Sequence, residues 1–234
     1  MSVVTLIPEY HYPDLESQVS ESNVRREGGL VSPQDSPVDR DGRTRRRERN
    51  AARLYDAADL LLAAQSFEEL TVEQICERAG VGKATFFRIF ESKAGLLREF
   101  NRRLARDAAE RIARTGDTDI RTTLGYVRAA IVDAWRHAGP GHVGMAREFI
   151  RSMPSTELHA AHPELLQLVT EAIGAAVASG ELPDRVPTDL AASLALLQMV
   201  APMTYTMSGQ EADIDELSSL LLDQWLAGMA HLVK

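Results

Sequence analysis

The chain has 234 residues, of which 44% are hydrophobic and 26% are charged, and its formal net charge is −8. This composition is typical of one large or two small folded domains, and no run of about 20 apolar residues predicts a membrane span. The single cysteine, Cys76, excludes an internal disulfide framework, and the first residues lack the basic region of a secretory signal. We therefore expect a cytoplasmic protein.

The charge is unevenly distributed along the chain. The segment from Arg43 to Arg106 contains 14 Lys and Arg against 9 Asp and Glu, a net +5, so the remainder carries −13. This pattern predicts a basic head on an acidic body, and a basic head is suited to binding a polyanion such as nucleic acid.

The N-terminal part has no regular apolar period. Residues 1–42 contain four prolines and many Ser, Asp and Glu, so we expect a disordered tail. A basic cluster follows, made of Arg43, Arg45, Arg46, Arg47 and Arg49. It is interpreted either as an arm that contacts phosphates or the minor groove, or as a solvated linker.

Two helices are predicted next, over about 46–64 and from Val72 to Ala79. Apolar residues recur every three or four positions in both, which gives each helix one buried face. Thr71 and Gln74 have the spacing of a capping box at the start of the second helix. Gly80 is expected to make a sharp turn, because only glycine adopts a positive φ at little cost.

The helix predicted from Lys83 to Phe90 has two different faces. Phe86 and Phe90 lie on one side and should be buried, whereas Ala84 and Arg88 point the opposite way. A short helix that is anchored by aromatic residues and exposes small and cationic side chains suits the major groove of DNA.

The stretch AGVGKATFFRIFESKAGLL resembles the helix-turn-helix of the TetR family of bacterial transcriptional regulators, and the close resemblance covers about residues 46–100. Two positions depart from the family pattern, with Phe87 where tyrosine is usual and Gly82 where serine is frequent. The resemblance implies a DNA-binding domain over 43–91 and a C-terminal ligand-binding and dimerisation domain over 92–234. It also implies that a dimer binds a near-palindromic double-stranded DNA operator, as a repressor associated with the nucleoid.

Candidate DNA contacts follow from these patterns. Arg88 is expected to bind a base edge, with guanine the best match, or alternatively a phosphate. Ala84 and Thr85 are expected to contact a thymine methyl or a phosphate, and Lys83 and Lys93 to hold the DNA backbone. The full predicted set is Arg45, Arg46, Arg47, Thr71, Lys83, Ala84, Thr85, Phe87, Arg88 and Lys93.

The rest of the chain is helical by period, with no persistent strand alternation, so we expect an all-α protein of about nine helices. A connecting helix is predicted over 92–114. Five more are predicted over 120–137, 143–153, 163–180, 187–208 and 214–232, with Pro202 kinking the fourth of them.

Two sets of apolar residues in this region are functional candidates. A ligand pocket for a small apolar effector is predicted from Trp135, Met145, Phe149, Met153, Met199 and Met203. A homodimer interface in the last two helices is predicted from Leu190, Leu194, Leu197, Leu217, Leu221 and Trp225. Ordinary core packing is the alternative for each set.

Other motifs indicate no chemistry. Gly139 to Gly144 matches G-x-G-x-x-G, but a predicted helix precedes it, whereas a dinucleotide site requires a strand there. His137, His142, His159 and His162 lack the spacing of a metal site, and no catalytic constellation is present. We therefore expect neither an enzyme nor a cofactor or metal, but a regulator released from DNA by a ligand. The alternative is a helix-turn-helix adaptor controlled by a protein partner.

Overall fold

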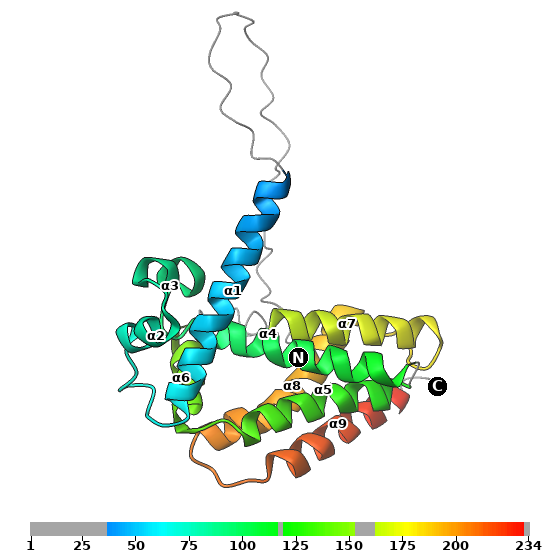
Figure 1. The fold of residues 1–234 in the computed structure, drawn as a ribbon. Helices are drawn as coiled ribbons and strands as arrows, with labels where there is room; N and C mark the ends of the chain where they lie inside the picture. The colour runs from blue at the N-terminus through cyan, green and yellow to red at the C-terminus, as the bar shows by residue number, and fades with distance from the viewer. Residues whose placement is uncertain (1–36, 117–118, 153–161, 232–234) are drawn as a thin grey trace, which may run out of the picture.

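The structure is a computed structural model that describes residues 37–116, 119–152 and 162–231. Over these residues it consists of nine α-helices without a β-strand, which confirms the all-α prediction (Figure 1). The helices are α1 (Pro37–Leu62), α2 (Val72–Ala79), α3 (Lys83–Phe90), α4 (Leu96–Thr115), α5 (Ile120–Arg136), α6 (Pro140–Ser152), α7 (Pro163–Ala178), α8 (Thr188–Met207) and α9 (Ile214–His231).

Helix α1 is longer than the sequence pattern predicted. It begins at Pro37, so residues 37–42, which were assigned to the disordered tail, are helical. Proline is tolerated at the first position of a helix, because the N–H that it lacks has no intrahelical partner there. The rest of the predicted tail lies outside the described residues.

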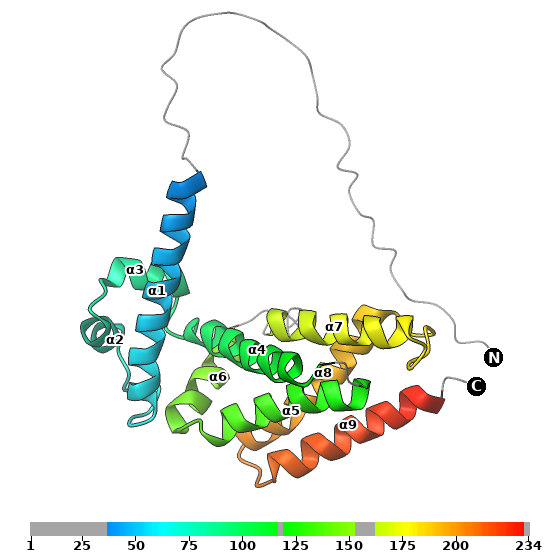
Figure 2. The same ribbon diagram turned by 45° about the vertical axis from the view of Figure 1, so that its right-hand side comes forward.

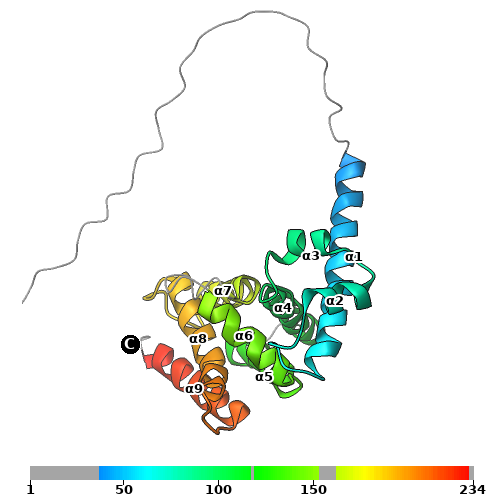
Figure 3. The same ribbon diagram turned by 90° about the vertical axis from the view of Figure 1, so that its left-hand side faces the viewer.

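Helices α1, α2 and α3 form the small head of the molecule. Leu54, Leu70, Ile75 and Phe86 are buried at its centre. The N-terminal half of α1 extends past α3 and away from the rest of the protein, as all three views show (Figures 1, 2 and 3). The head therefore has a long exposed helical edge beside the helix-turn-helix.

Helices α4 to α9 form the larger body. Helix α8 packs against α7 and α9, and α4 packs against α5 and α7 while also contacting α1. The side chains of Leu124, Ile131, Leu165, Ile173 and Met199 are almost completely buried. Because α4 contacts both parts of the molecule, it connects the head to the body (Figure 3).

Helix α8 is the one described helix whose length and apolar composition would allow it to cross a membrane. Its place in the bundle accounts for this composition, because it lies against two other helices and contributes Ala192, Ala195 and Met199 to the core. The helix runs continuously through Pro202, whose side chain is buried.

Candidate functional site

The orientation of α3 is the main feature of the head. Phe86 and Phe90 are buried, and their ring centroids lie 5.2 Å apart. Ala84 and Arg88 are exposed on the other side, and the side chain of Arg88 has no hydrogen-bond or ion-pair partner among the described residues. The structure therefore places the predicted faces of α3 as the sequence pattern indicated.

The turn before α3 is fixed by local chemistry. The N–H of Gln74 donates to Thr71 Oγ1 at 3.2 Å, and the N–H of Thr71 donates to Gln74 Oε1 at 2.8 Å. These bonds form the predicted capping box. Gly80 has φ of 61° and ψ of 39°, which is the left-handed conformation that glycine adopts most easily.

The remaining candidates around α3 differ in accessibility. Phe87 is 48% exposed, and Lys83 and Thr71 are also exposed, whereas Thr85 is half-buried. The ammonium group of Lys83 forms an ion pair with Glu73 on α2. A DNA phosphate would have to compete with this carboxylate for Lys83.

The basic cluster lies on α1. Arg45, Arg46 and Arg47 are exposed on the helical segment that extends past α3. The cluster thus lies along a helical edge and not on an extended arm. It adds positive charge to the side of the head where the N-terminal half of α1 projects (Figure 2).

The structure assigns Lys93 a different role from the predicted phosphate contact. Its Nζ donates to the carbonyl oxygens of Phe67 and Leu70 at 2.6 and 2.7 Å, and it lies 4.2 Å from the centroid of the Phe67 ring. Burial lowers the pKa of the Lys93 ammonium. Lys93 therefore ties the α1–α2 loop to the start of α4, and we leave it out of the proposed DNA contacts.

Replacing Lys93 with methionine tests this role. The variant keeps the aliphatic stem but leaves two carbonyl oxygens without their donor, so we expect it to unfold about 1–3 kcal/mol more easily. Chemical denaturation measures this loss. Under conditions where the variant is fully folded, its affinity for DNA should equal that of the original protein, and a large selective loss of DNA affinity would contradict the structural role.

A comparison with protein families identifies this head. Residues 54–100, from within α1 to the first turns of α4, match the model of the bacterial regulatory proteins of the tetR family. Residues 54–100 therefore form a helix-turn-helix of the TetR family, and the predicted resemblance to these transcriptional regulators is confirmed.

Solved structures share the fold of this TetR-family regulator over most of its length. The regulator FadR from Bacillus subtilis, in complex with stearoyl-CoA, is 18% identical with a TM-score of 0.57, covering 76% of this chain and 98% of that chain. A putative TetR-family regulator from a Rhodococcus species is 20% identical with a TM-score of 0.56, covering 78% and 98%. The TetR-family repressor AlkX from a Dietzia strain, implicated in biodegradation of n-alkanes, is 18% identical with a TM-score of 0.53, covering 79% and 97%. A comparison with curated protein sequences finds no match.

The body of the regulator contains an apolar cavity of about 280 Å³. Side chains from α4, α5, α6, α7 and α8 line it, together with His162 just before α7. Characteristic lining residues are Trp135, Ile150, Leu166, Val200, Met203 and Met207. The cavity thus lies among the helices that surround the connector α4.

The predicted pocket residues only partly coincide with this cavity. Trp135 and Met203 line it, but Met145, Phe149 and Met199 are buried in the core and do not. Their helix faces point toward neighbouring helices, which periodicity within one helix does not reveal. Met153 lies outside the described residues. Sequence patterns missed His162 as a lining residue, because the histidines were interpreted as solvated or core residues in preference to metal ligands.

The predicted dimer residues also separate into groups. Leu190, Leu194 and Leu197 are 50%, 41% and 46% exposed on α8, and the last two also border the cavity. On α9, Leu217 and Leu221 are half-buried, whereas Trp225 is buried inside the chain. Trp225 is therefore a core residue, because the buried face of α9 is offset from the predicted stripe.

Polar contacts that were not predicted hold α4 against α1. The Arg103 guanidinium donates to Asp56 Oδ1 at 2.7 Å and to the Ala52 carbonyl at 3.3 Å, and it lies over the Tyr55 ring. The buried carboxylate of Glu99 accepts a further bond from the same side chain at 3.4 Å. These contacts join head and body through side chains that are distant in sequence.

Helix α6 makes the second contact between body and head. His142 is buried, and its Nε2 lies 2.7 Å from Asp59 Oδ1 on α1. The hydrogen bond to His142 is the main reason that the pKa of the Asp59 carboxyl is lowered. The G-x-G-x-x-G motif around this histidine allows close approach, because a Cβ on Gly141 would lie 2.6 Å from the carbonyl oxygens of Leu62 and Gln65. The motif is thus part of the close contact between α6 and the end of α1, which we call the joint.

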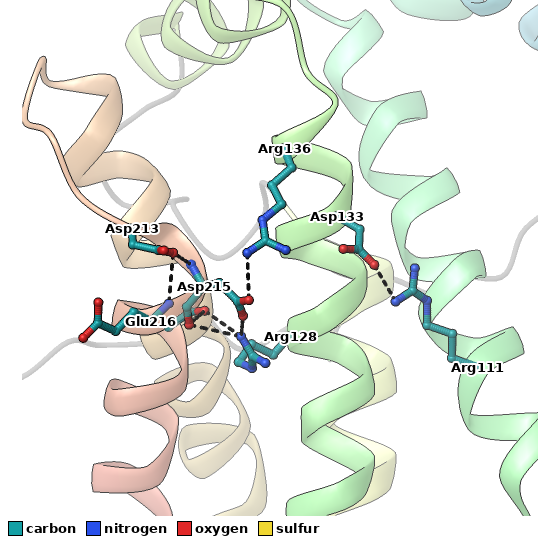
Figure 4. Close-up of polar contacts among 8 residues, drawn as sticks. Arg111, Arg128, Asp133, Arg136, Asp213, Asp215 and Glu216 are labelled. Atoms are coloured by element: carbon teal, nitrogen blue, oxygen red, sulfur yellow. Dashed lines mark hydrogen bonds and ion pairs between the residues drawn. The ribbon is translucent and has the colours of Figure 1, made fainter.

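A network of charges continues across the body (Figure 4). Arg111 on α4 donates to Asp133 on α5 at 2.9 Å. Asp215 on α9 accepts hydrogen bonds from two α5 residues, Arg128 and Arg136, the second at 2.8 Å. Ion pairs therefore connect α4 to α5 and α5 to α9. Within the described residues, no group of three His, Cys, Asp or Glu is arranged to hold a metal ion.

Proposed function

We propose that this regulator is a cytoplasmic repressor that binds a near-palindromic operator as a homodimer and is released by a small, largely apolar ligand. The observation that supports it most strongly is the outward face of α3, where Arg88 and Ala84 are exposed on a helix anchored by two buried phenylalanines. A helix of this kind presents its side chains to base edges in the major groove.

The proposed DNA contacts combine base and phosphate binding. We expect Arg88 to donate two hydrogen bonds to a guanine, with Ala84, Thr85 and Phe87 contributing contacts beside it. Arg45, Arg46 and Arg47 contribute phosphate contacts from α1, and Thr71 lies at the N-terminus of α2, where free N–H groups attract a phosphate.

Replacing Arg88 with alanine tests the base contact. We expect affinity for an operator selected from random duplexes to fall by about 1–3 kcal/mol, whereas affinity for random DNA should change little. Fluorescence anisotropy titration with both duplexes measures the difference.

Replacing Arg114 with alanine is the matched control. Arg114 is 70% exposed at the far end of α4, so its loss removes the same charge away from the head. It should leave both affinities unchanged. Equal losses on the operator and on random DNA in the Arg88 variant would contradict a base-specific role.

Exposed leucines on two neighbouring helices support the homodimer. Leu190, Leu194 and Leu197 on α8 and Leu220 on α9 are all more than 40% exposed, and α8 packs against α9. Pairing with the same two helices of a second copy would bury this surface in a four-helix bundle. It would also provide the two heads that half-sites about 34 Å apart require.

Replacing Leu220 with arginine tests the dimer. This leucine is 62% exposed and does not line the cavity, so a charge there should weaken association by at least about tenfold without unfolding the chain. Sedimentation velocity at micromolar concentration measures the change. The same substitution at Leu60 on α1, which is 57% exposed, should leave the oligomeric state unaltered. A monomer before any substitution would refute the proposed dimer.

The apolar cavity favours a small-molecule effector over a protein partner. Helix α4 lines the cavity and is held to α1 by Arg103, so a ligand that moves α4 would also move the head. By linkage, a ligand that prefers the DNA-free arrangement weakens operator binding. Two of the similar structures concern a stearoyl-CoA complex and n-alkane degradation, and the aliphatic chains of these compounds, unlike the charged CoA group, agree with a largely apolar ligand.

A further inference from the structure

The cavity contains one titratable side chain. Its lining is otherwise aliphatic and aromatic, with two hydroxyl residues, Ser193 and Thr204, and no Asp, Glu, Lys or Arg among the described residues that border it. The Ser193 hydroxyl already donates to the Asp189 carbonyl at 2.8 Å within α8. His162 is thus the distinctive polar group of the cavity.

The side chain of His162 has no structural task that the contacts reveal. The residue lies at the N-cap of α7, and its carbonyl accepts the Leu166 N–H at 2.9 Å, but its ring forms no capping hydrogen bond. The Nδ1 atom is buried and has no hydrogen-bond partner among the described residues. A buried polar atom without a partner is unfavourable, and a ligand group that bonded to it would remove this cost.

The ring is uncharged at neutral pH. Burial lowers the pKa of His162 to about 4, and the opposing influence of Glu164 is smaller. Glu164 is itself paired with Arg102, with 3.6 Å between Oε1 and Nε. A neutral imidazole offers one donor and one acceptor to a ligand, but it cannot compensate a negative charge.

We propose that the effector is an uncharged, mainly aliphatic molecule with one hydrogen-bonding oxygen, such as an alcohol or a ketone, and that this oxygen bonds to His162. The inference rests on the proposed ligand-responsive function and specifies its ligand class. A carboxylate of the same chain length is disfavoured, because burying its charge without a cation is costly. The volume of about 280 Å³ is near the lower end for ligand sites and favours a chain of medium length.

Three eight-carbon probes test the ligand class on the full-length protein. Octan-1-ol, octan-2-one and octanoate have similar chains, but only octanoate carries a charge at pH 7.5. At pH 7.5, isothermal titration calorimetry should show at least tenfold tighter binding of the two neutral compounds.

Two variants test the role of His162. His162→Phe should weaken octan-1-ol about threefold to tenfold while leaving octanoate unchanged, and His162→Asn, which restores a polar atom close to the position of Nδ1, should recover part of the loss. Ser208→Ala is the control outside the cavity. Its exposed hydroxyl donates to the Thr204 carbonyl at 3.0 Å, so all three affinities should stay the same.

The outcomes separate this inference from the proposed function. Failure of both neutral probes to bind at millimolar concentration, or octanoate binding as tightly as octan-1-ol, would overturn the inference. An unchanged ratio of octan-1-ol to octanoate affinity in His162→Phe would do the same. If the neutral probes bind selectively but leave operator affinity unaltered, the ligand class stands and the proposed release mechanism fails.

Discussion

A Gly95→Ala variant should lose at least about 3 kcal/mol of folding stability and much of its operator affinity. Gly95 has φ of −60° and ψ of −14°, which any residue can adopt, so the requirement for glycine is purely steric. A Cβ at this position would lie 1.9 Å from the Phe90 carbonyl oxygen, which is backbone at the end of α3. To relieve this clash, α3 or the start of α4 must move.

Differential scanning calorimetry measures the stability, and operator binding below the unfolding transition measures the position of α3. Gly125→Ala on α5 is the matched control, because a Cβ there would meet nothing within 4 Å. That variant should be about 0.5–1 kcal/mol more stable, since alanine favours the helix interior. If Gly95→Ala matched this control, the close contact between α3 and α4 would not constrain the head.

The second large effect is expected from Gly141→Ala, at the joint between α6 and α1. The added Cβ would lie 2.6 Å from two carbonyl oxygens and 2.9 Å from Leu62 Cα, so α6 must move away from the head. We expect a loss of about 2–3 kcal/mol. The hydrogen bond between His142 and Asp59 would be stretched at the same time, because both histidine and glycine lie at the start of α6.

Hydrogen exchange distinguishes this local separation from general destabilisation. Amides at the end of α1, around Leu62 and Gln65, should exchange faster in Gly141→Ala, whereas those of α9 should keep their protection relative to the global stability. Uniform acceleration throughout the chain would show that the joint has no separate mechanical role. Gly125→Ala again provides the comparison.

The features that the sequence predicted correctly are local ones. The capping box of Thr71 and Gln74, the turn at Gly80 and the two faces of α3 depend on residues within a few positions of one another. Propensity and periodicity act over this range, so they are sufficient to locate the helix-turn-helix and to orient Arg88.

The features that the sequence could not show depend on distant neighbours. Lys93 has the charge and location of a phosphate ligand, but its partners are carbonyls at positions 67 and 70. Gly95 and Gly141 are required because of backbone that approaches from other elements. Trp225 was grouped with Leu217 and Leu221, which are half-buried, and the packing of α9 against α8 and α5 decides that Trp225 is buried.

The location of Trp135 gives this regulator an intrinsic optical reporter. The chain has two tryptophans, and Trp135 borders the cavity with its ring centroid 5.3 Å from that of Phe100 on the connector, whereas Trp225 does not line the cavity. A Trp225→Phe variant would leave a single tryptophan, beside the proposed ligand. Its emission would then allow candidate compounds to be screened without any label, and the same signal would follow displacement of α4.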